Sequence, residues 1–261
     1  MGFYPFHNEG LYRGDFLTKK VAYNPHQHIA KSFVALVDAL LSEKNEVPFT
    51  KRFISDDEIQ ITKVEPDEAE QREVLEIIGS KYDGFDSTLN PIILVNSNAS
   101  DLLPQRRWHR KNYCELIKKI LAYNDKAIIL LTGAPAEREG LSILETCVND
   151  PRCINFAGDV KFLQLPTLYH LSAFMLTNDS GPAHFASITR MHTCVIFGPE
   201  TPALYGSLGS STPIFAALAC SPCVSAANHR KTPCTDNQCL QVITPGFVFE
   251  TLKGKLDQLP R

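Results

Sequence analysis

The sequence contains no uninterrupted apolar stretch approaching the roughly 20 residues that a membrane-spanning helix needs. It also lacks a basic excess, since a net charge of -3 gives no chain-wide field that would attract nucleic acid or an anionic membrane. The opening residues, MGFYPFHNEGLYRGDF, are aromatic, polar and charged, and they do not have the pattern of a signal peptide. We therefore expect a cytoplasmic globular protein that does not bind nucleic acid.

Cytoplasmic thiols stay reduced, so the 8 cysteines are not expected to form a disulfide framework. Four are scattered and are expected to be small buried apolar residues: Cys114, Cys147, Cys153 and Cys194. The other four form two close pairs, Cys220 with Cys223 and Cys234 with Cys239. These spacings occur among structural zinc ligands. The alternatives for this cluster are a structural zinc site, a pair of disulfides, or free thiols in a loop.

From Pro91 onward, short apolar runs alternate with helical patterns. The apolar runs predict buried strands at 92–96, 127–133, 153–158, 173–178 and 194–198. Apolar residues with helical spacing predict helices around 113–121, 136–148, 161–171 and 182–190. This alternation predicts an α/β fold with a parallel sheet covered on both faces, which is a Rossmann-like architecture.

The first third of the chain has a weaker pattern. Helices are predicted at 28–42, with an apolar face, and at 66–79, which opens with Pro66 and acidic residues. Residues 1–62 hold too few elements for a complete α/β domain. We therefore divide the chain into a partial N-terminal domain at 1–62, a linker with a helix at 63–90, and a C-terminal domain at 91–261.

Ligands of open parallel sheets bind at the carboxyl ends of the strands, so the loops there are the candidate sites. The loop NSNASDLLPQRRW (96–108) offers Ser100 and Arg106, a hydroxyl and a guanidinium that suit a phosphate. The alternative is a surface loop with solvated arginines. In the next loop, Glu137 has the chemistry to accept hydrogen bonds from ribose or a base, or it only complements a helix dipole.

The sequence NDSGPAH (178–184) joins a predicted strand to a predicted helix. Its Ser180 and Gly181 fit the cap, where free backbone N–H groups attract an anion, and glycine permits close approach to the backbone. His184 lies in the first turn and would lean toward the same end, where a bound diphosphate would favour its charged form. The alternative is a capped helix with a packed histidine. After the next strand, Glu200 and Thr201 either face a ligand or belong to a plain turn.

Taken in order, NSNASDLLPQRRW, TGAPAE, TNDSGPAHFAS, FGPETP and the four-cysteine cluster resemble the donor-binding half of family 9 glycosyltransferases, the lipopolysaccharide heptosyltransferases. The resemblance covers residues 91 to about 250. It implies a GT-B-like fold and metal-independent transfer from a nucleotide-diphosphate sugar, with ADP-heptose as the usual donor and a lipopolysaccharide-core or related glycan as the acceptor. It also implies a cytoplasmic enzyme, with a peripheral position at the inner face of the cytoplasmic membrane as one alternative.

The resemblance assigns the donor-site residues by position. It implies that Ser100 and Arg106 contact the donor phosphates and that Glu137 lies near the nucleoside. The remaining residues belong to the predicted anion loop: Asp179 shapes it, and Ser180, Gly181 and His184 bind the diphosphate. The resemblance implies no cofactor for catalysis, with zinc only as a structural candidate at Cys220, Cys223, Cys234 and Cys239.

The chain departs from the family at its start. Members open with an apolar strand that runs into a Gly-Asp loop carrying the acid thought to serve as general base. Here Gly14-Asp15 has no such strand before it, and the opening residues match the later part of the first domain, so the base remains unassigned. His26 and His28 either face the cleft or lie on the surface. We therefore keep three alternatives to an active transferase: a truncated remnant that binds the nucleotide-sugar, an epimerase of the same fold, and a dinucleotide oxidoreductase, which the missing G-x-G-x-x-G argues against.

Overall fold

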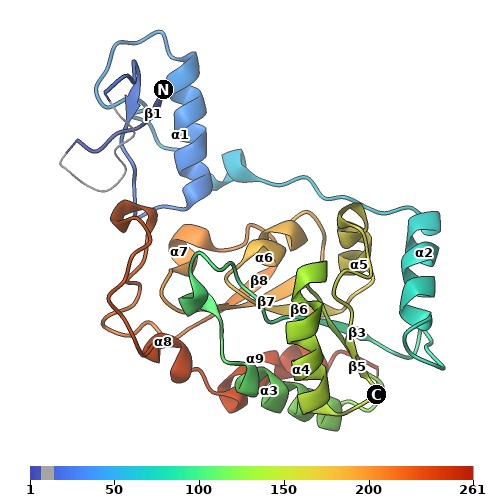
Figure 1. Cartoon of the computed structure of the whole chain (residues 1–261). Coiled ribbons are helices and arrows are strands. Elements are labelled where there is room, and N and C mark those ends of the chain that lie inside the picture. The colour runs from blue at the N-terminus through green and yellow to red at the C-terminus, as the bar shows by residue number, and fades with distance from the viewer. Residues whose placement is uncertain (7–14, 261) are drawn as a thin grey trace.

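The computed structural model describes residues 1–6 and 15–260, and it shows an α/β domain with a smaller N-terminal lobe on one side (Figure 1). The domain is built on a six-stranded parallel sheet with the order β5-β4-β3-β6-β7-β8. Its strands are β3 (Ile92–Asn96), β4 (Ile128–Leu131), β5 (Cys153–Asn155), β6 (Phe174–Asn178), β7 (His192–Phe197) and β8 (Ser211–Phe215). The predicted Rossmann-like parallel sheet is thus confirmed.

The two faces of the sheet are buried by different helices, because successive strand side chains point to opposite faces. Ile93 and Val95 pack with α3 (Arg110–Tyr123), α4 (Arg138–Val148) and α9 (Pro245–Leu256). Ile92 and Leu94 pack on the other face with α2 (Glu68–Gly79), α5 (Leu165–His170) and α6 (Gly181–Ala186). Burial on both faces explains why these strands are apolar throughout.

Short helices and turns complete the domain. These are α7 (Pro202–Tyr205), α8 (Gln238–Gln241) and the 3-10 turns η1 (Asp56–Ile59), η2 (Pro104–Arg106), η3 (Pro135–Glu137), η4 (Phe162–Gln164) and η5 (Ala226–Asn228). In the parts of the chain that the structure describes, no helix is long and apolar enough to cross a bilayer.

The structure differs from the sequence predictions at the far edge of the sheet. The sixth strand, β8, was not predicted, because its sequence STPIF begins with two polar residues and contains Pro213. An edge strand tolerates both features, since only one side needs hydrogen-bond partners. The helix predicted at 182–190 is α6, which ends at Ala186, and the C-terminal helix α9 was also missed.

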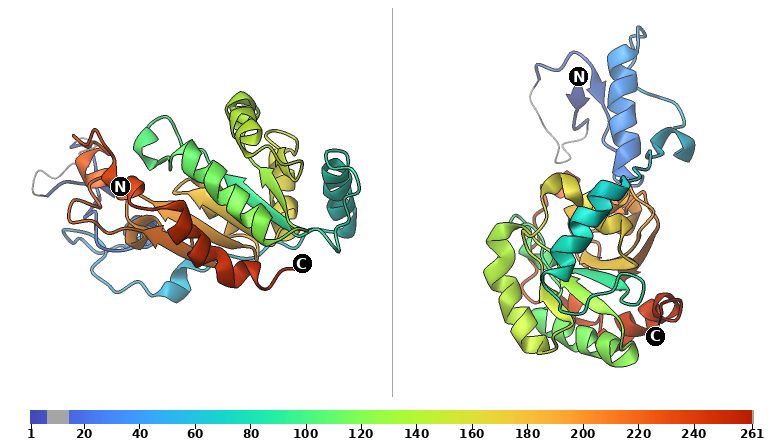
Figure 2. Two further views of the ribbon diagram at one scale, coloured as in Figure 1. Left: turned by 90° about the horizontal axis from the view of Figure 1, so that it is seen from below. Right: turned by 90° about the vertical axis from the view of Figure 1, so that its right-hand side faces the viewer.

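The N-terminal lobe consists of the parallel pair β1 (Gly2–Phe3) and β2 (Lys20–Val21) with α1 (Ile29–Leu41), and it projects from the sheet domain in the right-hand view of Figure 2. The helix buries Ser32, Ala35 and Ala39, while Phe33 and Leu40 of the predicted apolar face are exposed. The small sheet covers only a narrow stripe of α1, so the larger side chains remain outside. Of the predicted Gly14-Asp15 pair, Gly14 lies outside the described residues.

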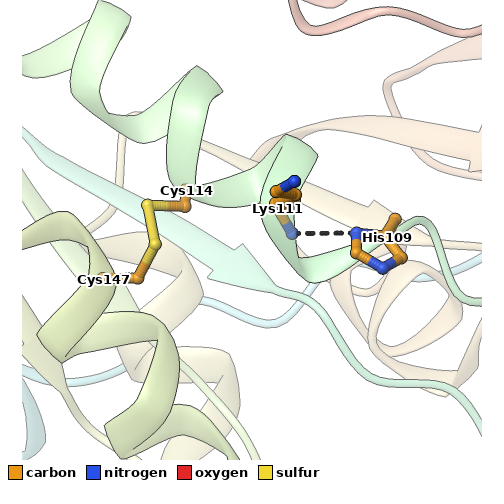
Figure 3. The surroundings of a disulfide bond; sticks show 4 residues. All are labelled: His109, Lys111, Cys114 and Cys147. Carbon is orange, nitrogen blue, oxygen red and sulfur yellow. Dashed lines mark hydrogen bonds between the residues drawn. A yellow bond between two sulfur atoms is a disulfide. The ribbon is translucent and has the colours of Figure 1, made fainter.

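Two of the scattered cysteines do not follow the prediction of reduced thiols. Cys114 of α3 and Cys147 of α4 are joined by a disulfide, with their Cα atoms 6.1 Å apart (Figure 3). Cys114 is buried, whereas Cys147 lies at the surface. The remaining pair, Cys153 and Cys194, are buried free thiols in β5 and β7, as predicted.

Candidate functional site

The sheet has a topological switch point between its central strands β3 and β6. From β3 the chain continues outward to β4 and β5, and from β6 it continues outward to β7 and β8 in the other direction. The loops after β3 and β6 therefore diverge at the carboxyl edge, where open parallel sheets bind their ligands.

A cavity of about 400 Å³ lies at this edge. Four of the predicted site residues line it: Ser100, Glu137, Ser180 and Gly181. Their side of the cavity is polar, with Asn96 and Asn98 nearby. Further lining is apolar and includes Phe156, Leu168 and Phe185. One cavity thus combines small polar groups with an apolar surface, the combination typical of small-molecule sites.

The loop after β3 is fixed to β6 by Asn178, a fully buried residue at the end of that strand. Its side-chain amide donates to the Ser97 carbonyl at 2.9 Å, and its Oδ1 accepts from the Trp108 backbone N–H at 3.0 Å and from the Tyr113 hydroxyl at 2.9 Å. Sequence reasoning treated Asn178 only as the end of a strand. These hydrogen bonds hold the loop that contains Ser100 against the loop that contains Ser180, so Asn178 helps to shape the site.

The junction between β6 and α6 presents an open backbone to the cavity. Ser180 is the extended N-cap residue, and its hydroxyl lies 3.2 Å from the Asn178 carbonyl instead of capping the helix. A Cβ added to Gly181 would meet nothing within 4 Å. Because α6 has only 6 residues, its dipole is weaker than the predicted longer helix would supply. Binding of an anion here would therefore depend on nearby side chains as well.

Arg106 does not line this cavity but lies beside it, between two buried carboxyl groups. Its Nη1 is 3.9 Å from Asp179 Oδ2 and 3.5 Å from Glu200 Oε2. Asp179 precedes Ser180 directly, so the guanidinium lies next to the predicted anion loop. Burial, together with the neighbouring Glu200, raises the pKa of Asp179 to about 8, while Arg106 and Arg230 act in the opposite direction.

His184 faces away from the main cavity. It lines a second, mainly apolar cavity with His28, Phe33 and Ile61. Burial lowers the pKa of His184, and the nearby His28 and Arg106 lower it further. His28 accepts the Ala30 N–H at Nδ1, so its neutral form donates from Nε2 to the Gly206 carbonyl at 2.9 Å. This bond joins the N-terminal lobe to the sheet domain, whereas His26 is exposed.

Glu137 has a structural role that coexists with its position on the cavity. Its Oε2 accepts the Ala134 N–H at 2.7 Å, which closes the turn η3. The other carboxylate oxygen makes no such turn contact, so the same side chain also fits the predicted position near a nucleoside. Both alternatives weighed for Glu137 are compatible with this geometry.

The four clustered cysteines are free thiols, three of them in the loop before α8 and the fourth, Cys239, in α8 itself. Burial, together with the neighbouring Cys223, Cys234 and Cys220, raises the pKa of Cys239 to about 11. The Asn237 N–H donates to Cys234 Sγ at 3.3 Å. Within the described ranges, no group of three or more His, Cys, Asp or Glu side chains is arranged to hold a metal ion.

The switch-point cavity, flanked by small polar groups, an open glycine backbone and an arginine, is typical of an α/β domain that binds a small molecule at the carboxyl edge of its sheet. Comparison with known proteins makes this more specific. Residues 16–233 match the family described as "Glycosyltransferase family 9 (heptosyltransferase)", so the chain belongs to that family.

Curated relatives are about a quarter identical to this chain over the residues that align. "Lipopolysaccharide heptosyltransferase 2" of Salmonella typhimurium is 28% identical over 102 residues, which are 38% of this chain and 29% of that protein. "Lipooligosaccharide heptosyltransferase 2" of Haemophilus influenzae is 28% identical over 172 residues, which are 63% of this chain and 46% of that protein. The chain thus spans less than half the length of these two relatives.

Solved structures confirm the GT-B fold. The "ADP-heptose lps heptosyltransferase II" of E. coli matches with a TM-score of 0.63 and 19% identity, over 93% of this chain and 66% of that one. A family 9 glycosyl transferase from Veillonella parvula matches with a TM-score of 0.64 and 16% identity, over 93% of this chain and 64% of that one. At these identities the similarity concerns the fold.

Proposed function

We propose that this chain binds a nucleotide-diphosphate sugar, with ADP-heptose as donor, and takes part in transferring the heptose to a lipopolysaccharide-core-type acceptor. The observation that carries the proposal is the cavity at the switch point, which combines apolar lining with Ser100, Ser180 and Gly181. Membership of the heptosyltransferase family supports the reaction type. The donor is supported by the name of a similar solved structure, which includes ADP-heptose, and the acceptor by the name of a curated relative, which includes lipopolysaccharide.

The donor is proposed to bind with its base against the apolar lining. Phe156, Leu168 and Phe185 offer the apolar surface that a base would cover. Glu137 then accepts from the ribose hydroxyls. The diphosphate lies over Ser180 and Gly181, where no side chain blocks the backbone.

In the proposed reaction an acceptor hydroxyl oxygen attacks the anomeric carbon, and the bond between that carbon and the diphosphate oxygen breaks. The departing nucleoside diphosphate gains negative charge, which the Arg106 guanidinium beside the anion loop would stabilise without a metal ion. The acceptor proton goes to a general base. No described residue is assigned the role of general base. We propose that the chain is cytoplasmic and works at the inner face of the cytoplasmic membrane.

A second candidate is donor binding without transfer. The described residues that line the main cavity come from positions 96 to 185, so the described part of the N-terminal lobe contributes none of them. The lobe reaches the second cavity instead, through His28 and Phe33. An epimerase would need an acid and a base residue beside the bound sugar, and the geometry favours no described residue for either role.

Thermal shift with ADP, UDP, GDP and NAD tests the proposed donor. A ligand present at about 100 times its Kd stabilises the folded chain by about 2.7 kcal/mol. We expect ADP to raise the melting temperature and the other three to have smaller effects. Stabilisation by NAD and not by ADP would refute the proposal. Transfer of heptose to an acceptor, assayed on the purified chain, then separates a transferase from a binding protein.

A further inference from the structure

Glu200 belongs to a buried charge cluster that sequence reasoning did not foresee. The side chain is 1% exposed, and Asp179 beside it is 3% exposed. Arg106 contacts both carboxyl groups, and Arg230 Nε lies 3.5 Å from the second Glu200 oxygen. Two buried carboxyl groups therefore share two arginines at the edge of the proposed donor cavity.

The charged groups of this cluster lack short hydrogen bonds. Asp179 Oδ2, Glu200 Oε1 and Arg106 Nε are buried without a hydrogen bond, although Asp179 Oδ2 keeps its long contact with Arg106 and Glu200 Oε1 its ion pair with Arg230. Buried polar groups are nearly always hydrogen-bonded, because leaving one unpaired costs about 1–3 kcal/mol. The cluster is thus held by long ionic contacts.

The contacts of Arg106 with the two carboxyl groups are long, so a ligand can replace them. Distances of 3.5 and 3.9 Å exceed the 2.7–2.9 Å of a strong charge-assisted hydrogen bond. A diphosphate over Ser180 would offer Arg106 shorter, bidentate contacts. Glu200 would keep Arg230, so its charge would not be left without a counter-ion.

We propose that Glu200 is a positioning residue of the donor site, an inference that rests on the proposed function. It holds the Arg106 guanidinium beside Asp179 until a nucleoside diphosphate takes that guanidinium, and Glu200 and Asp179 then hold one proton between them. Two carboxyl groups this close do not both ionise when buried, because the second negative charge is repelled by the first. Loss of Arg106 to the ligand strengthens that repulsion.

The direction of proton movement follows from the charges around the pair. Burial and Glu200 raise the pKa of Asp179 to about 8, and Arg106 and Arg230 oppose the rise. The other titratable groups near the cluster are Tyr205, Tyr23 and His184. A bound diphosphate adds negative charge and removes Arg106, so the pKa of the pair rises again. ADP binding should therefore take up a proton, and its affinity should fall as the pH rises above 8.

Calorimetric titration with ADP at pH 8.5, in buffers of different ionisation enthalpy, measures this proton. The ADP phosphate has finished titrating at that pH. If binding raises the pKa of the pair by about one unit, the wild-type chain takes up about half a proton per ADP. Over the range from pH 7 to 9.5 its affinity then falls by up to about tenfold. Adenosine, which has no phosphate, should give no uptake.

Two variants and one control separate positioning from a structural role. In Glu200→Gln, and independently in Asp179→Asn, one carboxyl group remains beside two arginines without a second carboxyl group to repel its charge, so proton uptake should fall and the affinity should depend less on pH. Both variants keep the net charge that the wild-type pair has with its one proton. Glu250→Gln, an exposed carboxylate on α9, should behave as wild type.

The outcomes distinguish this proposal from the proposed function. ADP binding without proton uptake by the wild-type chain, or undiminished uptake by Glu200→Gln, would overturn the role of Glu200 and leave the donor site intact. Absence of any ADP binding by the wild-type chain would overturn the donor site itself and the role of Glu200 with it. If Glu200→Gln does not fold, Asp179→Asn and the wild-type pH dependence decide the question.

Discussion

Gly181 offers the sharpest test of the donor site, because the fold gives no reason for a glycine there. Its backbone is not in the left-handed region that favours glycine. A Cβ at this position would meet no atom within 4 Å. The residue nevertheless lines the cavity at the point where a diphosphate is proposed to lie. We infer that the glycine leaves room for the ligand.

The perturbation is Gly181→Ala, with Gly254→Ala as the matched control. Gly254 lies in α9, is exposed, and also has no atom within 4 Å of an added Cβ. Both changes reduce the freedom of the unfolded chain without straining the folded one, so each should raise the free energy of unfolding by roughly 0.4–1 kcal/mol. Only the first change places a methyl group between the backbone and the ligand.

A methyl group forced into a close contact costs about 1–3 kcal/mol, which is about a 5- to 150-fold loss of affinity. Calorimetry with ADP should show this loss for Gly181→Ala and no change for Gly254→Ala, while urea unfolding shows both variants to be as stable as wild type or more so. Wild-type affinity in Gly181→Ala would refute the reasoning, because the phosphates would then not approach this backbone. Equal losses in both variants would point to a general effect of the substitution.

Two further predictions concern His184 and the cysteine cluster. The folded-state pKa of His184 lies below its unfolded value, so its contribution to stability is present at neutral pH and is lost as the pH falls below about 6.5. Between pH 7.5 and 5.5, urea unfolding should therefore show a smaller decrease in the free energy of unfolding for His184→Gln than for wild type or for the exposed control His229→Gln. For the cysteines, metal analysis of reduced protein should find one zinc per chain in wild type and in Cys147→Ser, and none in Cys220→Ser. A metal-free wild type would remove the zinc hypothesis in favour of free thiols or disulfides.

The sheet could be predicted from the sequence wherever burial acts on both faces of a strand. β3, β4 and β6 are continuous apolar runs because helices cover both sides of them. β8 could not be found in this way, because an edge strand is only half buried and carries Pro213 and polar residues. The same limit applies to α1, whose apolar stripe predicted a buried face that the small lobe covers only in part.

The sequence could predict those residues of the candidate site that directly follow the ends of strands. Ser100, Glu137, Ser180 and Gly181 follow three strands whose carboxyl ends share one edge, so they line one cavity. Glu200 follows β7, the neighbour of β6, and was weighed either as facing a ligand or as part of a plain turn. Its ion pair with Arg230 could not be predicted, because Arg230 belongs to a loop 30 residues further along the chain and carries no local signal of that contact.

The charge cluster also accounts for the position of Arg106 outside the cavity that its sequence motif predicted. A buried guanidinium without a counter-ion is costly, so a site proposed to accept a diphosphate needs an internal anion while it is empty. Glu200 and Asp179 supply that anion. A ligand with more negative charge than the pair can then displace it from Arg106, whereas a neutral nucleoside cannot. Charge selectivity for a diphosphate would thus arise from competition within the protein and not from the cavity walls alone.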